Sequence, residues 1–321
     1  MKAVRIHEFG GLDVLNWEDA PDPEPRPHQV LIKVDAAGVN YADLMRRGGN
    51  YPGPDLPSSL GLEAAGTVLE VGSEVTGLSV GQRVMAMGPG GQAEMVAVNG
   101  NFVFPYPETL DPVQAGGMPI VFLTAYHLLK TRGHLDPGHT VLIQAGASGV
   151  GTVAIQLAKA WGARVVVTAS TQEKLDLCRS LGADETINYT QQDFEEVIKE
   201  QTGGNGVELI LECVGGPVLE KSLRCVASYG RMITYGNASG TPASLPAGEI
   251  FAANRTVIGF SIGRSPVGTL DHQAAMDEIF PLMSEGKVRL IVDQVLPMSE
   301  VGTAHQHLAD RGTRGKVILT P

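Results

Sequence analysis

A glycine-rich turn near the middle of the chain carries the clearest chemistry. It consists of Ala145, Gly146, Ala147, Ser148, Gly149, Val150 and Gly151. An apolar run leads into it, and a segment with helical periodicity follows it. Glycines at such a strand–turn–helix junction let the backbone approach a pyrophosphate closely, and the helix N-terminus offers unpaired N–H groups and a positive dipole end. We therefore expect residues 145–151 to bind the phosphates of a dinucleotide.

The next apolar run, residues 164–170, indicates which nicotinamide cofactor binds. Sites for NAD usually carry an Asp or Glu near the end of this strand, where the carboxylate accepts a hydrogen bond from the ribose 2′-hydroxyl. The segment 164–172 contains no acidic residue. Ser170 and Lys174 are instead suited to a 2′-phosphate, so the sequence favours NADPH over NADH.

These motifs belong to a repeating pattern of apolar runs and helical segments. The apolar runs cover residues 140–146, 164–170, 185–189, 207–214, 231–235 and 256–262. Helical segments link the first five runs and cover residues 150–161, 172–181, 193–201 and 219–227. Units of this βαβ kind build a parallel sheet with helices on both faces, which explains why the runs are rich in Val, Ile and Leu. The predicted fold class is α/β with a doubly wound parallel sheet.

The N-terminal part of the chain follows a different pattern. Short strands are predicted over residues 2–6, 29–34, 64–71 and 82–84, and Pro- and Gly-rich turns separate them. No helical segment alternates with these strands, so we expect an irregular, largely antiparallel β domain. The C-terminal segment, with a helix over 271–284 and a strand over 315–319, is expected to complete this domain. The predicted domains are therefore 1–122 with 264–321, and 123–263.

Composition narrows the class of protein. The 321 residues include 43% hydrophobic and only 18% charged residues, which suits two packed cores and argues against disorder. The net charge of −11 disfavours nucleic acid and anionic membranes as partners. The N-terminus lacks the apolar segment of a signal peptide, and no apolar run is long enough for a membrane span. With three cysteines and no CxxC pair, we expect a cytoplasmic protein without disulfides.

Taken together, the motifs resemble those of the medium-chain dehydrogenase/reductase superfamily, in its zinc-independent NADPH:quinone oxidoreductase branch. The resemblance runs from end to end and includes, besides the glycine turn, residues 1–4, 38–40, 61–66, 81–84, 181–184, 187–189, 236–240 and 315–317. It implies a Rossmann domain joined to a GroES-like irregular β-barrel domain, with the active site in the cleft between them. It also implies a homodimer through the edge strand 256–262, in accord with the need of an apolar edge for a partner.

Zinc ligands are missing at the positions where zinc-dependent relatives carry them. Those relatives have a cysteine within the segment equivalent to 38–40, and a His-Glu pair where this chain has Leu62 and Glu63. No cysteine precedes Cys178, and the eight His residues show no ligand spacing. The resemblance therefore implies no metal site and hydride transfer without a Lewis acid, which makes alcohol dehydrogenation a less favoured reaction.

The resemblance also implies roles for single residues. Asn40, Tyr51 and Thr124 match catalytic positions: Asn40 orients substrate or cofactor, Tyr51 donates to the substrate oxygen, and Thr124 lies near the nicotinamide. The matching cofactor-binding positions are Asn40, Thr124, Gly146, Ala147, Ser148, Gly149, Val150, Gly151, Ser170, Lys174, Tyr189, Gly215, Asn237, Phe260 and Gly263.

The substrate stays open between several classes. A quinone suits a site with Asn and Tyr, because a quinone is already electrophilic and needs no strong acid. Met45 stands where some members of the branch have a second tyrosine, which leaves room for a small aliphatic enone or carbonyl substrate. One alternative is an enoyl-thioester reductase, whose carrier would meet Arg46, Arg47 and Arg264. Another is a non-catalytic NADPH-binding or structural protein.

Overall fold

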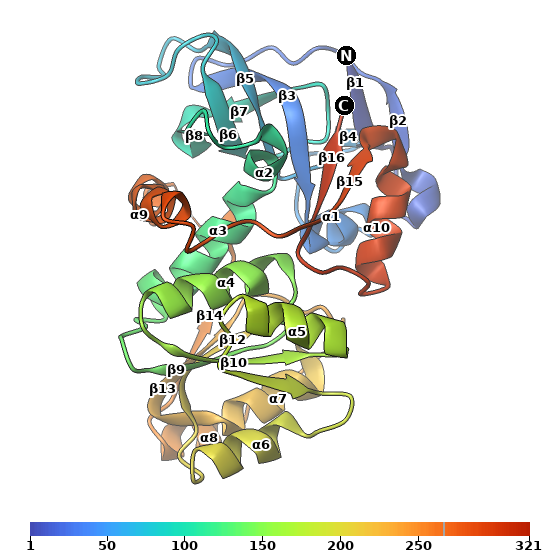
Figure 1. Ribbon diagram of the computed structural model, residues 1–321. Coiled ribbons are helices and arrows are strands. Elements are labelled where there is room, and N and C mark those ends of the chain that lie inside the picture. The colour runs from blue at the N-terminus through green and yellow to red at the C-terminus, as the bar shows by residue number, and fades with distance from the viewer. Residues whose placement is uncertain (266) are drawn as a thin grey trace. The chain divides into compact units, whose positions relative to one another are not determined.

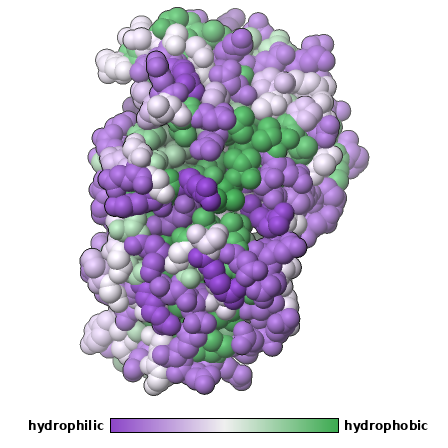
Figure 2. Space-filling view, viewed as in Figure 1, coloured by the Kyte–Doolittle hydropathy of each residue, from purple (hydrophilic) through white to green (hydrophobic). Residues whose placement is uncertain are grey.

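The computed structural model describes residues 1–265 and 267–321, and the chain divides into two compact units (Figure 1). Unit 1 comprises Met1–Val121 and Leu290–Pro321, and unit 2 comprises Phe122–Arg289. Each unit buries its own cluster of apolar side chains. Hydrophilic side chains accordingly cover most of the face shown in Figure 2. Among the described residues, no helix is both long and apolar enough to cross a membrane.

Unit 2 contains the predicted parallel sheet. Its strands are β9 (Thr140–Ile143), β10 (Arg164–Ala169), β11 (Glu185–Asn188), β12 (Val207–Glu212), β13 (Val226–Thr234) and β14 (Thr256–Gly259). They form one six-stranded sheet in the order β11-β10-β9-β12-β13-β14, and all neighbours are parallel. The winding direction reverses between β9 and β12, and ligands bind at the carboxyl ends of strands beside such a point. The predicted α/β fold class is confirmed.

The helices of unit 2 cover both faces of this sheet. They are α4 (Gly149–Ala160), α5 (Gln172–Ser180), α6 (Phe194–Gln201), α7 (Gly216–Arg224) and α8 (Ala247–Ala252). In Figure 1, α4 and α5 lie on one face, and α6 and α7 lie on the other. Side chains of Ser148, Thr171 and Asp193 accept hydrogen bonds from backbone N–H groups at the starts of α4, α5 and α6. Such caps explain why these helices begin within a residue of the predicted positions.

The segment from α7 to β13 differs from the prediction. The helix expected over 219–227 is α7, which ends at Arg224 because residues from Val226 already belong to β13. The register of β13 against β12 shifts between Val226 and Arg231, so the strand contains an irregularity that a short apolar run does not reveal.

The helix expected to complete the first domain belongs instead to unit 2. This helix, α9 (His272–Ser284), follows the short 3-10 helix η4 (Ile262–Arg264). It pairs with α3 (Met118–Tyr126) and the π-helical segment η3 (His127–Arg132), because Tyr126 donates to Glu278 and the rings of His127 and His272 hydrogen-bond. The predicted boundary at 264 therefore differs from the structure, in which unit 1 resumes at Leu290. Periodicity predicts a helix but not the surface on which its polar side chains find partners.

Unit 1 is built from two sheets. The larger has the order β15-β16-β3-β5-β6-β8, with β7 also paired to β3, and the smaller has the order β2-β1-β4. The larger sheet contains β3 (Gln29–Val39), β5 (Glu63–Val71), β6 (Arg83–Met87), β7 (Met95–Asn99), β8 (Val103–Pro105), β15 (Val292–Pro297) and β16 (Lys316–Thr320). The smaller contains β1 (Lys2–Ile6), β2 (Asn16–Asp19) and β4 (Ser58–Ser59). All pairs are antiparallel except β15 with β16, so the predicted irregular, largely antiparallel domain is confirmed.

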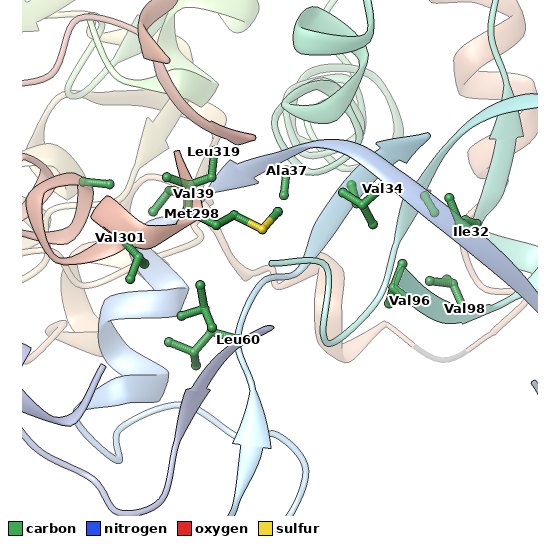
Figure 3. Packing of buried hydrophobic residues seen from close by; sticks show 14 of the residues in the cluster. Ile32, Val34, Ala37, Val39, Leu60, Val96, Val98, Met298, Val301 and Leu319 are labelled. Carbon is green, nitrogen blue, oxygen red and sulfur yellow. The ribbon is translucent and has the colours of Figure 1, made fainter. Parts of the chain in front are cut away.

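The core of unit 1 lies between its sheets and the C-terminal segment. Val34, Leu60, Met298 and Leu319 pack in one buried cluster (Figure 3). The helix α10 (Val301–Ala309) connects β15 to β16 and contributes Val301 to the same cluster. The remaining short elements are the 3-10 helices η1 (Leu12–Val14), η2 (Gly100–Phe102) and η5 (Met298–Glu300).

Short helices interrupt unit 1, contrary to the expectation that no helix alternates with its strands. They are α1 (Tyr41–Arg47) and α2 (Pro112–Gly116). The backbone N–H of Asn40 donates to the Asp43 carboxylate at 2.8 Å and stabilises the start of α1. Asp111 accepts from the N–H of Val113 and starts α2 in the same way. Helices of five and seven residues are too short to show the apolar periodicity on which the prediction depended.

Candidate cofactor and substrate sites

The glycine turn has the geometry of a phosphate-binding loop. Ser148 Oγ accepts from the N–H of Gly151 at 3.1 Å and so caps α4. A Cβ at Gly151 would lie 2.5 Å from the carbonyl oxygen of Ala145, so only glycine fits there. In the described part of the chain, the N–H groups of Gly149 and Val150 have no acceptor. These two N–H groups lie in the first turn of α4, where a pyrophosphate would find donors and a positive dipole end.

A buried polar network lies beneath this turn. Thr168 Oγ1 donates to Gln144 Oε1 at 2.6 Å, and Gln144 Nε2 donates to Ser222 Oγ at 3.1 Å. The N–H of Gly146 donates to the carbonyl oxygen of Thr168 at 2.9 Å. The network therefore ties the turn to β10 and α7. Sequence reasoning did not include it, although a polar Gln144 at the end of an apolar run was a usable signal.

The residues predicted for the 2′-phosphate gather at one edge of the sheet. Ala169 pairs with Asn188, so Ser170 and Tyr189 follow neighbouring strands. The N–H of Tyr189 donates to the carbonyl oxygen of Ala169, and its side chain is exposed. Lys174 lies in the first turn of α5, four residues after Ser170. Because β10 pairs in parallel with β9, this group lies at the same edge as the glycine turn, as the sequence predicts.

Gly215 and Asn237 come together at the ends of β12 and β13. Gly215 has a φ of 78°, and a Cβ there would lie 2.1 Å from Asn237 Oδ1. Glu212 Oε1 accepts from the N–H groups of Val214 and Gly215 at 2.7 and 2.9 Å, and burial raises the pKa of its carboxyl. Glu212 thus shapes the turn that holds Gly215, a role that the sequence reasoning missed.

The remaining predicted residues of unit 2 lie on other elements. Phe260 follows β14, is buried, and donates its N–H to the carbonyl oxygen of Thr234. Gly263 lies within η4. Thr124 is buried in α3 and, among the described residues, makes no hydrogen bond to another predicted site residue. The structure therefore brings Phe260 to the carboxyl edge of the sheet and leaves the predicted role of Thr124 untested.

Asn40 belongs to a buried cluster of charged side chains in unit 1. Lys316 Nζ donates to Asn40 Oδ1 at 2.6 Å, and Asn40 Nδ2 donates to Glu63 Oε1 at 2.9 Å. Lys316 and Glu63 also form an ion pair with an N–O distance of 2.6 Å. The prediction included Asn40 but neither Glu63 nor Lys316 as site residues. Charged residues within otherwise apolar strand segments were the signal for both.

The backbone around this ion pair donates a hydrogen bond to it and leaves space for it. Glu63 Oε2 accepts from the N–H of Ile120 at 2.7 Å, so both carboxylate oxygens are occupied. A Cβ at Gly38 would lie 2.3 Å from Glu63 Oε1 and 2.7 Å from Lys316 Cε. Gly38 is thus the residue that leaves room for the ion pair beside β3.

A second buried carboxyl, that of Asp43, borders the cluster. It accepts from the N–H of Asn40 at 2.8 Å and from Gln92 Nε2 at 3.4 Å. Burial raises the pKa of Asp43 to about 7, against the opposing effects of these hydrogen bonds and of Lys316. The cluster therefore holds two carboxyl groups near a single ammonium group.

Tyr51 and the arginines of unit 1 lie beside α1. Tyr51 is half-buried in the loop between α1 and β4. Arg46 lies over the ring of Phe9 and donates to the carbonyl oxygen of Pro54. Arg47 Nη1 lies 3.3 Å from Nδ1 of the buried His305. Both arginines are thus engaged within unit 1.

Possible metal ligands are not clustered in the described residues. No group of three or more His, Cys, Asp or Glu side chains there is arranged to hold a metal ion. Cys178, Cys213 and Cys225 are free thiols, and burial raises the pKa of each to about 12.

Comparisons with known proteins agree with this architecture. Residues 26–108 match the family model of the alcohol dehydrogenase GroES-like domain, and residues 149–285 match that of zinc-binding dehydrogenase. A quinone oxidoreductase of Pseudomonas aeruginosa is 36% identical over 100% of this chain and 99% of its own length. A 2-haloacrylate reductase of Burkholderia sp. is 34% identical over 99% of this chain and 98% of its own length.

A solved structure extends the agreement to three dimensions. The Escherichia coli quinone oxidoreductase complexed with NADPH has a TM-score of 0.95 and 31% identity, and the match covers 100% of both chains. Unit 1 accordingly contains the GroES-like domain that the resemblance implied, and unit 2 contains the Rossmann sheet. The chain belongs to the medium-chain dehydrogenase/reductase superfamily, in its quinone oxidoreductase branch.

Proposed function

We propose that this protein is an NADPH-dependent reductase that transfers hydride to a quinone or to another small enone or carbonyl compound. One observation carries the proposal: the glycine turn offers unpaired N–H groups beside a strand end that has Ser170 and Lys174 but no carboxylate. Its relatives support it, since they include quinone oxidoreductases and one of them was solved with NADPH.

Each part of the cofactor has matching residues in unit 2. The N–H groups of Gly149 and Val150 bind the pyrophosphate, and Ser170 with Lys174 binds the 2′-phosphate. Tyr189 packs near the adenosine phosphate, while Gly215, Asn237, Phe260 and Gly263 bind along the carboxyl edge of the sheet. Bound NADPH supplies the hydride equivalent from its dihydronicotinamide ring. Thr124 lies near that ring in this proposal.

Asn40 and Tyr51 act on the substrate. Both side chains can donate a hydrogen bond to an oxygen that gains negative charge as hydride arrives. A quinone then needs one hydride and one solvent proton to become a hydroquinone. No metal ion takes part in this proposal, and the ammonium group of Lys316 supplies positive charge within the Asn40 cluster.

The substrate class can be narrowed by two observations. A relative named 2-haloacrylate reductase favours small activated alkenes as a second candidate class beside quinones. Arg46 and Arg47 already contact Phe9 and His305, which weighs against their use in binding the carrier of a thioester. We therefore place quinones first, small activated alkenes second and enoyl thioesters third.

A homodimer is part of the same proposal. β14 is the edge strand of a parallel sheet, and one of its sides has no neighbouring strand within the described residues. Pairing with the β14 of a second copy would satisfy its backbone groups. Light scattering is expected to give twice the mass of 33.9 kDa, and a monomer mass would overturn this arrangement.

The direct test follows NADPH oxidation by the purified protein. A panel of quinones, 2-haloacrylate and a crotonyl thioester are compared as acceptors, each also with NADH. Turnover of quinones that prefers NADPH and falls in Tyr51→Phe is expected. Turnover of the thioester alone would move the protein to the enoyl reductases. Tight NADPH binding without turnover of any acceptor would support a non-catalytic protein.

A further inference from the structure

We propose that Lys316 and Glu63 are positioning residues that fix the orientation of the Asn40 side-chain amide. In this arrangement Asn40 presents an N–H donor, so the ligand group that it contacts must be an acceptor oxygen. The inference rests on the proposed function for the identity of the ligand. The orientation itself rests only on contacts within unit 1.

The two charged partners determine the positions of Oδ1 and Nδ2 in the Asn40 amide. An ammonium group can only donate hydrogen bonds, and an ionised carboxylate can only accept them. Lys316 Nζ lies 2.6 Å from one end of the amide, and Glu63 Oε1 lies 2.9 Å from the other. The reversed orientation would place the NH2 group against the ammonium and the carbonyl oxygen against the carboxylate. The amide is therefore held with Oδ1 toward Lys316 and Nδ2 toward Glu63.

Only Asn40 is accessible within this trio. Asn40 is 8% exposed, whereas Glu63 and Lys316 are 1% and 3% exposed. Nδ2 carries two hydrogens and donates one of them to Glu63 Oε1, so a second donor position remains for an acceptor of the ligand. Asn40 is thus the member of the trio that a ligand can contact. Lys316 and Glu63 act through it.

The trio is anchored on three neighbouring strands. Asn40 follows β3, Glu63 begins β5 and Lys316 begins β16, and β3 pairs with both β5 and β16. Glu63 is fixed further by the N–H of Ile120, and the ion pair fills the space that a side chain at Gly38 would occupy. Charge-assisted hydrogen bonds in such a buried place are strong, so the amide has little freedom to turn.

The acceptor oxygen has two possible sources, which differ in their kinetic consequence. It is either the carbonyl oxygen of the substrate or a hydroxyl oxygen of the cofactor. If it is the substrate, loosening the amide lowers kcat/KM for the quinone and leaves the Kd for NADPH unchanged. If it is the cofactor, the Kd for NADPH rises by a similar factor. Both sources are consistent with the positioning role.

The test is a double-mutant cycle on the full chain. Lys316→Met removes the donor to Oδ1, and kcat/KM or NADPH affinity is expected to fall roughly 10- to 100-fold, because small displacements of a reacting contact cost this much. Asn40→Ala removes the amide itself. If Lys316 acts through Asn40, the double variant is no worse than Asn40→Ala alone. Fully multiplied losses would overturn the inference.

Matched variants separate positioning from folding. Lys221→Met makes the same chemical change at the Lys221–Asp193 ion pair of unit 2 and is expected to keep full activity. If Lys316→Met does not fold, the pair Lys316→Met with Glu63→Gln, which leaves no buried net charge, replaces it in the same cycle. The cycle remains decisive with that double variant. Its loss of kcat/KM or NADPH affinity disappears in the Asn40→Ala background if the pair acts through Asn40, and persists if it does not.

A spectroscopic signal makes the result independent of turnover. The side-chain amide protons of Asn40 are assigned by NMR from their loss in Asn40→Ala. One of them is expected to exchange slowly with solvent in the unsubstituted chain and at least tenfold faster in Lys316→Met. If this is seen while no acceptor is reduced, the proposed function fails and the positioning role stands. If turnover is present but exchange is unchanged, the positioning role fails.

Discussion

Each of the two units contains a buried polar network. The two networks differ in charge and in how far apart their bonded residues lie along the sequence. In unit 2, Gln144, Thr168 and Ser222 form a neutral network beneath the glycine turn. In unit 1, Asn40 is held by Lys316 and Glu63, which form a buried ion pair. A neutral network holds a loop with only a modest desolvation cost. A buried ion pair stabilises the fold only while both partners are present, because loss of one leaves a buried, unpaired charge. The comparison suggests that unit 2 shapes a backbone, while unit 1 fixes a single functional group.

The largest expected effect comes from breaking the charged network. Glu63→Ala leaves the Lys316 ammonium buried without its partner and is expected to lower the free energy of unfolding by roughly 3–5 kcal/mol. Urea denaturation measures this loss. The paired variant Glu63→Met with Lys316→Met should recover part of it, since it removes the unpaired charge. A loss below about 1 kcal/mol in Glu63→Ala would show that the pair is not desolvated as described.

The next effect is the pH dependence of stability that arises from Asp43, which borders the charged network. The pKa of Asp43 is raised from 3.8 to about 7, so the native state holds this proton more tightly than the unfolded chain does. Stability contributed by the protonated form is therefore lost as pH rises from about 4 to 7, by up to about 1.4 kcal/mol per pH unit. Asp43→Asn should flatten this slope between about pH 4 and 7. Parallel stability curves for the two proteins would contradict the raised pKa.

A smaller effect is expected from breaking the neutral network. Gln144→Leu leaves the hydroxyl groups of Thr168 and Ser222 without their amide partner. The free energy of unfolding is expected to fall by about 1–3 kcal/mol, the cost of unpaired buried polar groups. The loss should not vary between pH 5 and 8, because no member of the network titrates there. A pH-dependent loss would remove the distinction between the two networks.

The smallest effect concerns only the backbone of the glycine turn. In Gly151→Ala the added Cβ meets the carbonyl oxygens of Ala145 and Gly146 at 2.5 and 2.6 Å. NADPH affinity is expected to fall about tenfold, or 1.4 kcal/mol, as measured by fluorescence titration. Gly248→Ala, where no atom lies within 4 Å of the added Cβ, is the matched control. Equal affinities of the two variants would mean that the turn does not bind the cofactor.

The same comparison explains what the sequence could predict. The parallel sheet, its helices and the glycine turn were predictable because their signals are local: apolar runs, caps such as Ser148, and glycines at one junction. The partners of Asn40 were not, because Glu63 and Lys316 lie 23 and 276 residues away along the chain. The place of α9 was missed for a similar reason, since Tyr126 and His127 lie 152 and 145 residues away from their partners in α9.

The proposal that this protein is an NADPH-dependent reductase that needs no metal has one most direct test. It is the measurement of kcat/KM for quinone reduction with NADPH and with NADH, before and after treatment with a metal chelator. We expect turnover, a preference for NADPH that falls when Ser170 and Lys174 are replaced by Ala, and no effect of the chelator. Absence of turnover, an equal or greater rate with NADH, or loss of activity on chelation would contradict it.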